Sequence, residues 1–254
     1  MTQRNYRACL DHVLKWEGGY VDHPRDPGGA TNHGITRATL AQHLGRPVTK
    51  AEVKALTVET AGEIYRPRYW DKVRGGDLAD GFDLVAFDGG VNSGPRRGVR
   101  WLQKGLGVTA DGVMGPQTQA AANGAGDRVV VIQRACAARM GFLRGLKTWS
   151  SFGRGWARRV ADTEATAVAM ATRSAEVLVD EAAKARKAVR NEVSSAAGTT
   201  VTGVGADQAA GLPGWSGWVI AAAVVIIIFP LVMRAIHNAR RAAAYRAKAQ
   251  GISQ

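Results

Sequence analysis

Apolar residues recur at three- and four-residue steps over much of the chain, which predicts short α-helices separated by glycine and proline. In the range 5–17 these positions are Tyr6, Cys9, Leu10, Val13 and Leu14, the spacing of one helix face. A glycine pair follows where helices commonly end. The same pattern predicts further helices over residues 36–44, 49–66, 82–91, 96–106, 115–123 and 126–146.

Two local signals sharpen this pattern. Thr49 followed by Glu52 forms a capping box, which predicts a helix start at that point. Residues 20–34 carry two prolines and three glycines, so this range is predicted as a loop.

The C-terminal third of the chain has a different pattern. Residues 160–195 are rich in alanine and charged residues with few breakers, which predicts one long helix, and a small-residue linker follows. Residues 215–233, WSGWVIAAAVVIIIFPLVM, are 19 residues without a charge. That length is about enough to cross a bilayer core of roughly 30 Å. Tryptophans at one edge and Arg234 at the other favour a single transmembrane helix with a cytoplasmic C-terminus.

These elements together predict a mainly α protein with a large helical N-terminal part. The expected organisation is a helical N-terminal domain, a small helical module, an alanine-rich helix with a flexible linker, a transmembrane helix and a basic cytoplasmic tail. Their expected ranges are 1–91, 92–165, 166–214, 215–233 and 234–254.

Charge is distributed unevenly over these parts. The chain has 34 basic and 21 acidic residues and a formal net charge of +13. Residues 1–91 hold 12 of each sign, whereas residues 92–160 hold 12 basic residues and two acidic ones. A basic module beside a neutral one indicates an anionic partner for the basic module. Two cysteines, Cys9 and Cys136, are too few for a disulfide scaffold and are expected to be buried free thiols.

The predicted loop and the helix before it hold the candidate chemistry. Glu17 lies in the last helical turn between Trp16 and Tyr20. The negative helix end and the apolar neighbours should raise its pKa, as a general acid requires. The alternative is a solvated carboxylate at a helix end. Glycosidases use two carboxyl groups, and Asp26 is the preferred second one. Asp22 is the alternative, but an aspartate in such a loop commonly caps a turn, and this structural role is favoured for Asp22.

Polar neighbours in the loop extend this candidate site. Thr31 and Asn32 could hold a water molecule or a sugar hydroxyl. His23 and His33 are ten residues apart without a zinc motif, so they favour a substrate cleft over a metal site. No metal and no cofactor is expected.

Three stretches resemble glycoside hydrolase family 108, lysozyme-like N-acetylmuramidases of phage endolysins and related systems. They are EGGYVDHPRDPGGATNHGIT, IYRPRYWDKVRGGDL and FDLVAFDGGVNSGP, in that order. The later stretch VRWLQKGLGVTADGVMGPQTQAA is similar to the predicted peptidoglycan-binding module of the same family. The resemblance covers about residues 5–165. It implies a lysozyme-like helical catalytic domain over residues 1–91 and a small helical peptidoglycan-binding module over residues 92–165.

The resemblance implies that Glu17 is the catalytic acid, with Asp26 and Thr31 as its partners. Four residues separate Asp26 from Thr31, one fewer than the phage-lysozyme spacing, so Thr31 fits that pattern less closely than Glu17. The expected substrate-binding residues are Tyr20, Asn32, His33, Tyr69, Trp70 and Asn92.

The implied function is hydrolysis of the β-1,4 bond between N-acetylmuramic acid and N-acetylglucosamine in peptidoglycan, for cell-wall degradation or host lysis. The alternatives are a lytic transglycosylase and a non-catalytic membrane protein that tethers a structure to the wall. Expected partners are peptidoglycan, the bilayer through residues 215–233, and a holin. Nucleic acid is not expected, because no stacking platform accompanies the arginines of the basic module. The expected location is the inner membrane, with a single span and a periplasmic catalytic domain.

Overall fold

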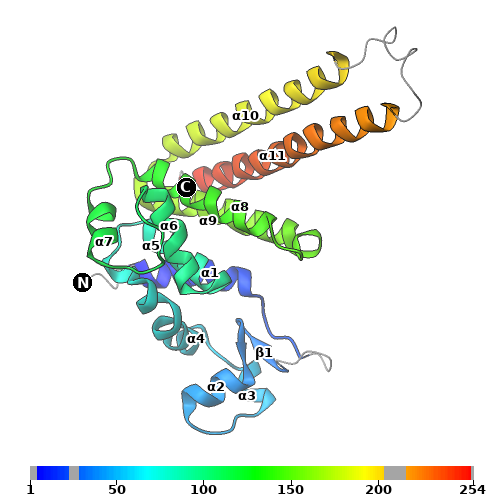
Figure 1. Ribbon diagram of the computed structural model, residues 1–254. Coiled ribbons are helices and arrows are strands. Elements are labelled where there is room, and N and C mark those ends of the chain that lie inside the picture. Colours follow the sequence, from blue (N-terminus) through cyan, green and yellow to red (C-terminus); the bar gives the residue numbers. More distant parts are fainter. Residues whose placement is uncertain (1–4, 23–28, 203–215, 253–254) are drawn as a thin grey trace. The chain divides into compact units, whose positions relative to one another are not determined.

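The protein is mainly helical, as the sequence predicts. A computed structural model describes residues 5–22, 29–202 and 216–252, with side chains described outside 197–202 and 216–228 (Figure 1). Its elements are α1 Tyr6–Glu17, β1 Thr31–Asn32, β2 Ile35–Thr36, α2 Arg37–Leu44, α3 Lys50–Lys54, α4 Val58–Tyr65, the π-helix η2 Arg66–Trp70, the 3-10 helices η3 Asp71–Val73 and η4 Gly75–Asp77, α5 Phe82–Ser93, α6 Pro95–Leu106, α7 Pro116–Asn123, α8 Arg128–Arg144, α9 Trp149–Thr172, α10 Ala175–Thr202 and α11 Ser216–Ile252.

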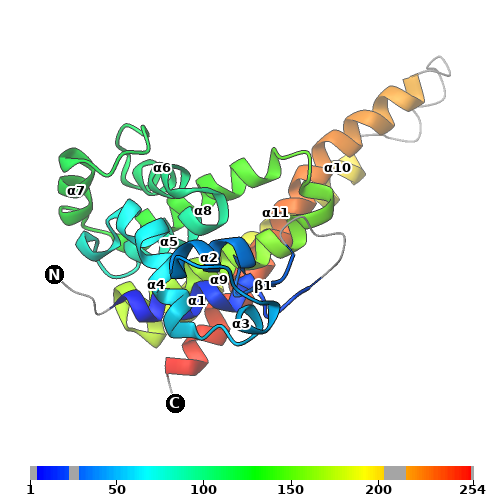
Figure 2. The same ribbon diagram turned by 90° about the horizontal axis from the view of Figure 1, so that it is seen from below.

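The chain divides into two compact units, Met1–Ser151 and Phe152–Gln254. In the first unit α5 is the central element. Its residues from 82 to 90 are all buried, so this helix packs against other elements on every side. The helices α1, α6 and α8 and the η elements pack against it, and Figure 2 shows them around it. Cys9 on α1 and Cys136 on α8 are buried free thiols, as predicted.

The contact between α5 and α6 is unusually close. A Cβ on Gly98 of α6 would overlap the carbonyl oxygen of Ala86 and lie 2.6 Å from the backbone nitrogen of Gly90 on α5. The buried Asp88 of α5 also accepts a hydrogen bond from the buried Arg139 of α8. The expected boundary at residue 91 therefore falls inside α5, and the two predicted modules share one packed core.

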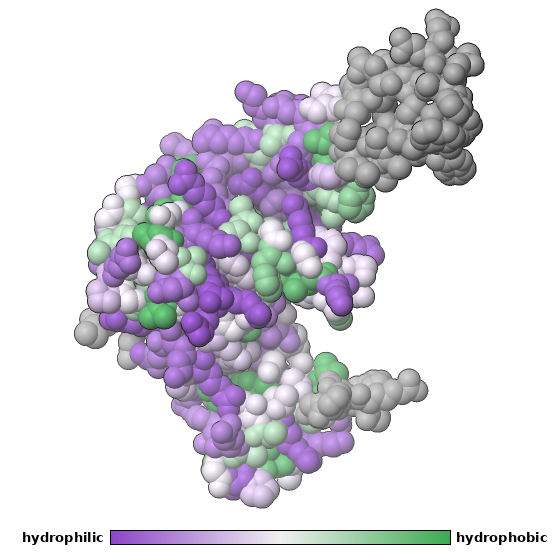
Figure 3. Space-filling view, in the orientation of Figure 1, coloured by the Kyte–Doolittle hydropathy of each residue, from purple (hydrophilic) through white to green (hydrophobic). Residues whose placement is uncertain are grey.

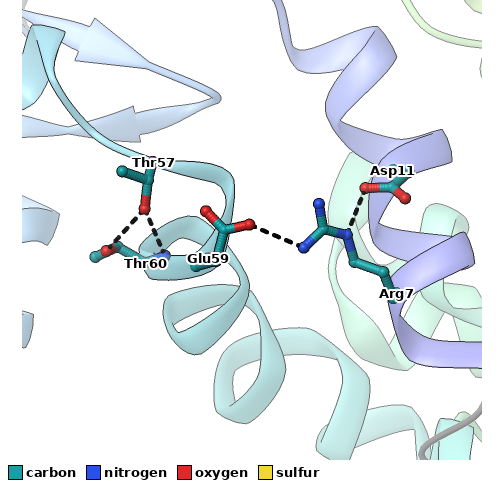
Figure 4. Close-up of polar contacts among 5 residues, drawn as sticks. All are labelled: Arg7, Asp11, Thr57, Glu59 and Thr60. Atoms are coloured by element: carbon teal, nitrogen blue, oxygen red, sulfur yellow. Dashed lines mark hydrogen bonds and ion pairs between the residues drawn. The ribbon is translucent and has the colours of Figure 1, made fainter.

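Contacts between α1 and α4 fix the relative position of two helices that both end at the candidate site. The Tyr6 hydroxyl donates to the carbonyl oxygen of Gly62 at 2.5 Å. Arg7 donates from Nη1 to Glu59 and from Nε to Asp11, both at 3.0 Å (Figure 4). The exposed ion pairs add little stability by themselves, so the partly buried Tyr6 contact is the stronger constraint.

Two predicted helices are each interrupted in the structure. The capping box at Thr49 and Glu52 is confirmed, with Thr49 N–H donating to Glu52 Oε2 at 2.8 Å. That helix ends at Lys54, because Thr57 is extended and caps a new helix, α4, by accepting from Thr60 N–H at 3.2 Å. The predicted helix over 160–195 is also two helices, because Arg173 has a φ of 53° and ends α9 before α10 begins.

In the second unit α10 and α11 run side by side (Figure 1). Residues 234–252, expected as a basic tail, continue α11 and carry packed side chains. Tyr245 is fully buried, and its hydroxyl donates to Glu164 of α9 at 2.7 Å. Arg241 donates to the same carboxylate oxygen at 2.7 Å. Residues 234–252 are thus part of this helical unit.

No helix in the described parts of the chain is long and apolar enough to cross a bilayer. Most of the expected transmembrane range, 215–233, lies outside the described side chains. The helix that contains it continues to Ile252. The structure therefore gives the predicted span no support, and the inner-membrane location remains a prediction.

Candidate active site

Glu17 is the last residue of α1, as predicted. The helix ends there because Gly18 adopts a φ of 76°, which glycine allows at little cost. The Glu17 side chain is half-buried. Its place at the helix end directs the carboxyl group toward a short hairpin that follows in the chain.

The hairpin consists of β1 and β2, with Thr31 opposite Thr36 and Asn32 opposite Ile35. Its two-residue turn has positive φ angles at both positions, 50° at His33 and 71° at Gly34. A positive φ at both central residues is the requirement of a type I′ turn, and glycine satisfies it best. This hairpin was not predicted, because the range 20–34 reads as a loop in the sequence.

The Glu17 carboxyl group and the Tyr65 hydroxyl meet over Gly34. A Cβ on Gly34 would lie 2.9 Å from Glu17 Oε2 and 2.6 Å from Tyr65 Oη. Tyr65 is the last residue of α4 and is 4% exposed. The site thus brings together the end of α1, the hairpin turn and the end of α4.

Hydrogen bonds from side chains to backbone carbonyl oxygens hold this turn in place. The Tyr65 hydroxyl donates to the carbonyl oxygen of His33 at 2.9 Å. The Asn32 amide donates to the carbonyl oxygens of Val53 and Lys54, at 3.1 Å each, and so joins the hairpin to α3. Because these donors and acceptors come from three elements, the turn under Glu17 is fixed from both sides.

The predicted partners of Glu17 lie at different places relative to this turn. Asp26 and His23 fall outside the described residues. Asp22 forms an ion pair with Lys50 at 3.0 Å. Thr31 pairs with Val21 through two backbone hydrogen bonds of 2.8 Å, and its hydroxyl donates to the carbonyl oxygen of Gly29 at 3.2 Å. Thr31 therefore lies on the strand that leads into the turn.

Three predicted substrate-binding residues are half-buried near the hairpin or α4. Tyr20 lies with the Lys54 ammonium 5.9 Å from its ring centroid. His33 contributes its carbonyl oxygen to the turn. The Tyr69 ring lies 5.4 Å from that of Tyr65, centroid to centroid. These three side chains keep exposed surface beside the site.

The other three take structural roles. Trp70 is 2% exposed and packs between Tyr6 and Phe87, so its ring has no surface to offer a sugar. The Asn32 amide is buried and bonds to α3. Asn92 accepts from Arg139 Nη2 at 3.1 Å at the end of α5. The sequence motifs that contain these residues therefore also encode the scaffold.

Tyr65 and Gly34 are site residues that the sequence analysis did not single out. Tyr65 stands four residues before Tyr69, in the same motif. A histidine–glycine pair between two short extended stretches is a hairpin-turn signal that could have identified Gly34. The arrangement can present a carboxyl group, held by rigid backbone, to a bound substrate as a proton donor or acceptor.

Two known protein families match consecutive parts of the first two thirds of the chain. The description "Glycosyl hydrolase 108" matches residues 10–94, and "Predicted Peptidoglycan domain" matches residues 97–161. The first range contains Glu17, the hairpin and Tyr65. A search of curated protein sequences found no match.

A solved structure is also similar, that of Brucella abortus SagA. Its sequence is 48% identical, and the TM-score is 0.58. The match covers 67% of this chain and 98% of that chain. About a third of this chain therefore has no counterpart there.

Proposed function

The chain belongs to the glycosyl hydrolase 108 family, and from that premise we propose that it is a muramidase of peptidoglycan. The proposed reaction is hydrolysis of the β-1,4 bond between N-acetylmuramic acid and N-acetylglucosamine. A peptidoglycan-binding domain directly after the hydrolase domain supports this choice of polymer.

In the proposed mechanism Glu17 is the general acid. It protonates the bridging glycosidic oxygen as the bond breaks, so that the sugar leaves as a neutral alcohol. Asp26 orients or activates the attacking water and stabilises the positive charge that develops at the anomeric carbon. Thr31, on the strand beside the turn, helps to place that water.

One observation carries the proposal. The Glu17 carboxyl group is held at the Gly34 turn beside the Tyr65 hydroxyl, on elements joined by buried hydrogen bonds. A catalytic group must stay in a productive orientation, and rigid elements achieve this better than a free loop.

The test is digestion of purified peptidoglycan by the full chain and by its Glu17→Gln variant. We expect new reducing ends from the wild type and at least about a hundredfold slower release from the variant, the usual effect of losing a general acid. Glu63→Gln is the matched control, because this glutamate is exposed on α4 and pairs with His43. It should keep the wild-type rate.

The products separate the alternatives. Reducing N-acetylmuramic acid ends support the muramidase, whereas anhydro ends identify a lytic transglycosylase. Retention of the protein on peptidoglycan without any cleavage would identify a tether. Undiminished cleavage by Glu17→Gln would refute Glu17 as the acid.

A further inference from the structure

A small cavity lies at the junction of α5 and α6, in the first unit. It is lined by Ser93, Gly94, Pro95, Arg96, Arg97 and Arg100, and its volume is about 320 Å³. That volume is at the low end of the range for ligand pockets, roughly 300–1,000 Å³. Three of its six lining residues are thus arginines. In Figure 3 hydrophilic residues cover most of the visible surface around α6.

Two of the three arginines are held by groups that do not neutralise their charge. Arg97 donates from Nη1 to the carbonyl oxygen of Ser93 at 3.0 Å, and its guanidinium lies 5.0 Å from the Phe142 ring centroid. Arg96 donates from Nη2 to the carbonyl oxygen of Asp111 at 3.4 Å. Carbonyl oxygens and an aromatic face orient a guanidinium while its full positive charge remains.

Carboxylates do not compensate this charge at close range. Across the described residues, no ion pair involves Arg96, Arg97 or Arg100. The pKa of Asp111 is lowered mainly by the hydrogen bond that its carboxylate accepts from Val113 N–H. The positive charge of Arg96 makes a smaller contribution in the same direction. Asp111 Oδ1 also accepts from Gln103 at 2.7 Å. Asp111 is therefore a turn cap, and its Oδ1 is already bonded.

The loop after α6 is fixed against these arginines. The buried Gln103 accepts from Gly112 N–H at 2.8 Å and donates to Val113 O and Thr118 Oγ1 at 3.0 Å each. A Cβ on Gly112 would lie 3.1 Å from Arg100 Cγ. Because the loop packs directly on the stem of Arg100, the wall of the cavity is preorganised.

From these contacts we propose that the cavity binds a carboxylate of the peptidoglycan stem peptide. A planar guanidinium presents paired N–H donors that match the two oxygens of a carboxylate. The cavity has room for a single side chain or chain end. It is lined by a part of the chain that adjoins and enters the peptidoglycan-domain match at residues 97–161.

The inference rests on the proposed function only in taking peptidoglycan as the partner. Glu17 and its turn line no part of the cavity. Stem-peptide binding would therefore position the polymer, whereas cleavage of the glycan would depend on Glu17. The two roles can be measured separately.

The test uses the full chain and a variant with Arg96→Gln, Arg97→Gln and Arg100→Gln. The matched control is Lys104→Gln, Arg128→Gln and Arg134→Gln, which removes the same charge from exposed residues of the same module outside the cavity. The probe is a disaccharide-tetrapeptide whose internal bond is not the one that a muramidase cuts. A second probe is the same molecule with its peptide carboxylates amidated. Circular dichroism verifies that all three proteins are folded.

We expect the cavity variant to bind the first probe at least about tenfold more weakly than wild type, and the control to stay within about twofold. Wild type should bind the amidated probe about as weakly as the cavity variant binds the free acid. Equal binding of both probes by wild type, or equal losses in both variants, would overturn the inference.

Further measurements distinguish ligand binding in the cavity from catalysis at Glu17. They also test whether the cavity binds nucleic acid. Hydrolysis of glycan strands without stem peptides should be the same in the cavity variant and wild type, and Glu17→Gln should still discriminate between the two probes. If no protein cleaves glycan but the discrimination remains, the proposed enzyme fails and the carboxylate site stands. If the cavity variant instead loses only salt-sensitive binding of a DNA duplex, the site binds nucleic-acid phosphates and the proposal is wrong.

Discussion

Gly34 lacks a side chain at the point where the two polar groups of the candidate site meet. Its φ of 71° favours glycine, and its Cβ position lies within 3 Å of both Glu17 Oε2 and Tyr65 Oη. A side chain at this position would strain the backbone because of the positive φ. It would also displace the Glu17 carboxyl group, because there is no room for a Cβ atom. A matched pair of alanine substitutions separates these two effects.

Gly34→Ala should lower peptidoglycan hydrolysis about a hundredfold, because displacing a catalytic group by about 1 Å has an effect of that order. Gly45→Ala is the control, since Gly45 has a φ of 68° and no neighbouring atoms within 4 Å of its Cβ position. Both variants should lose about 1–2 kcal/mol of unfolding free energy from the strained backbone. Rate assays and urea unfolding measure the two effects, and equal activity in the two variants would contradict the role given to Gly34.

At the scale of elements, the first turn of α5 carries a buried carboxyl group. Asp83 is 1% exposed, and its Oδ1 accepts from the backbone N–H groups of Gly81 and Leu84. Burial raises its pKa from 3.8 to about 6, in spite of these hydrogen bonds and one from Asn5. The folded protein therefore binds this proton more tightly than the unfolded chain does.

This pKa predicts a pH dependence of stability. The contribution of Asp83 is full below about pH 4 and is lost as the pH rises to about 6, since the unfolded carboxyl group releases its proton first. Asp83→Asn stays uncharged throughout, so its unfolding free energy should rise relative to wild type across that window by up to about 3 kcal/mol. Urea unfolding at pH 4, 5, 6 and 7 gives both curves. A constant difference between them would contradict the expectation.

The sequence predicts the helices of the first unit well where local signals determine them. Apolar spacing and Gly18 define α1, and Thr49 with Glu52 defines the start of α3. The site is harder to predict, because Gly34, Tyr65 and Glu17 meet only through tertiary packing. Trp70 is a second residue whose role the sequence does not determine. An aromatic residue in a family motif can stack on a sugar or fill the core, and only its burial in the structure shows that Trp70 fills the core.

At the scale of the whole molecule, the first unit, which ends at Ser151, contains the hydrolase match and most of the peptidoglycan-domain match. Asp88 lies in the first match and Arg139 in the second, and both are buried. Arg139 also lies 5.6 Å from the Trp101 ring centroid. The polymer-binding part and the cleaving part are thus joined by a packed interface instead of a linker.

Breaking this buried pair should destabilise the whole unit. Arg139→Met removes the buried ion pair with Asp88 and should lower the unfolding free energy by about 3–5 kcal/mol, whereas the double variant Asp88→Leu with Arg139→Met should recover most of that loss. Arg7→Met breaks two exposed ion pairs and should lower the unfolding free energy much less than Arg139→Met does. Urea unfolding, followed by one probe in each of the two matched ranges, measures these free energies. Separate transitions for the two matched ranges in wild type would contradict a shared unit.

The bonds between Glu164 and the end of α11 have a consequence for the order in which the protein is made. Arg241 follows Glu164 by 77 residues and Tyr245 follows it by 81. A nascent chain leaving the ribosome contains all of the first unit long before it contains either partner. Until Arg241 and Tyr245 have been made, the Glu164 carboxylate lacks the two donors that bond it in the folded unit. The second unit therefore completes the packing around Glu164 only after that later part of the chain has been synthesised.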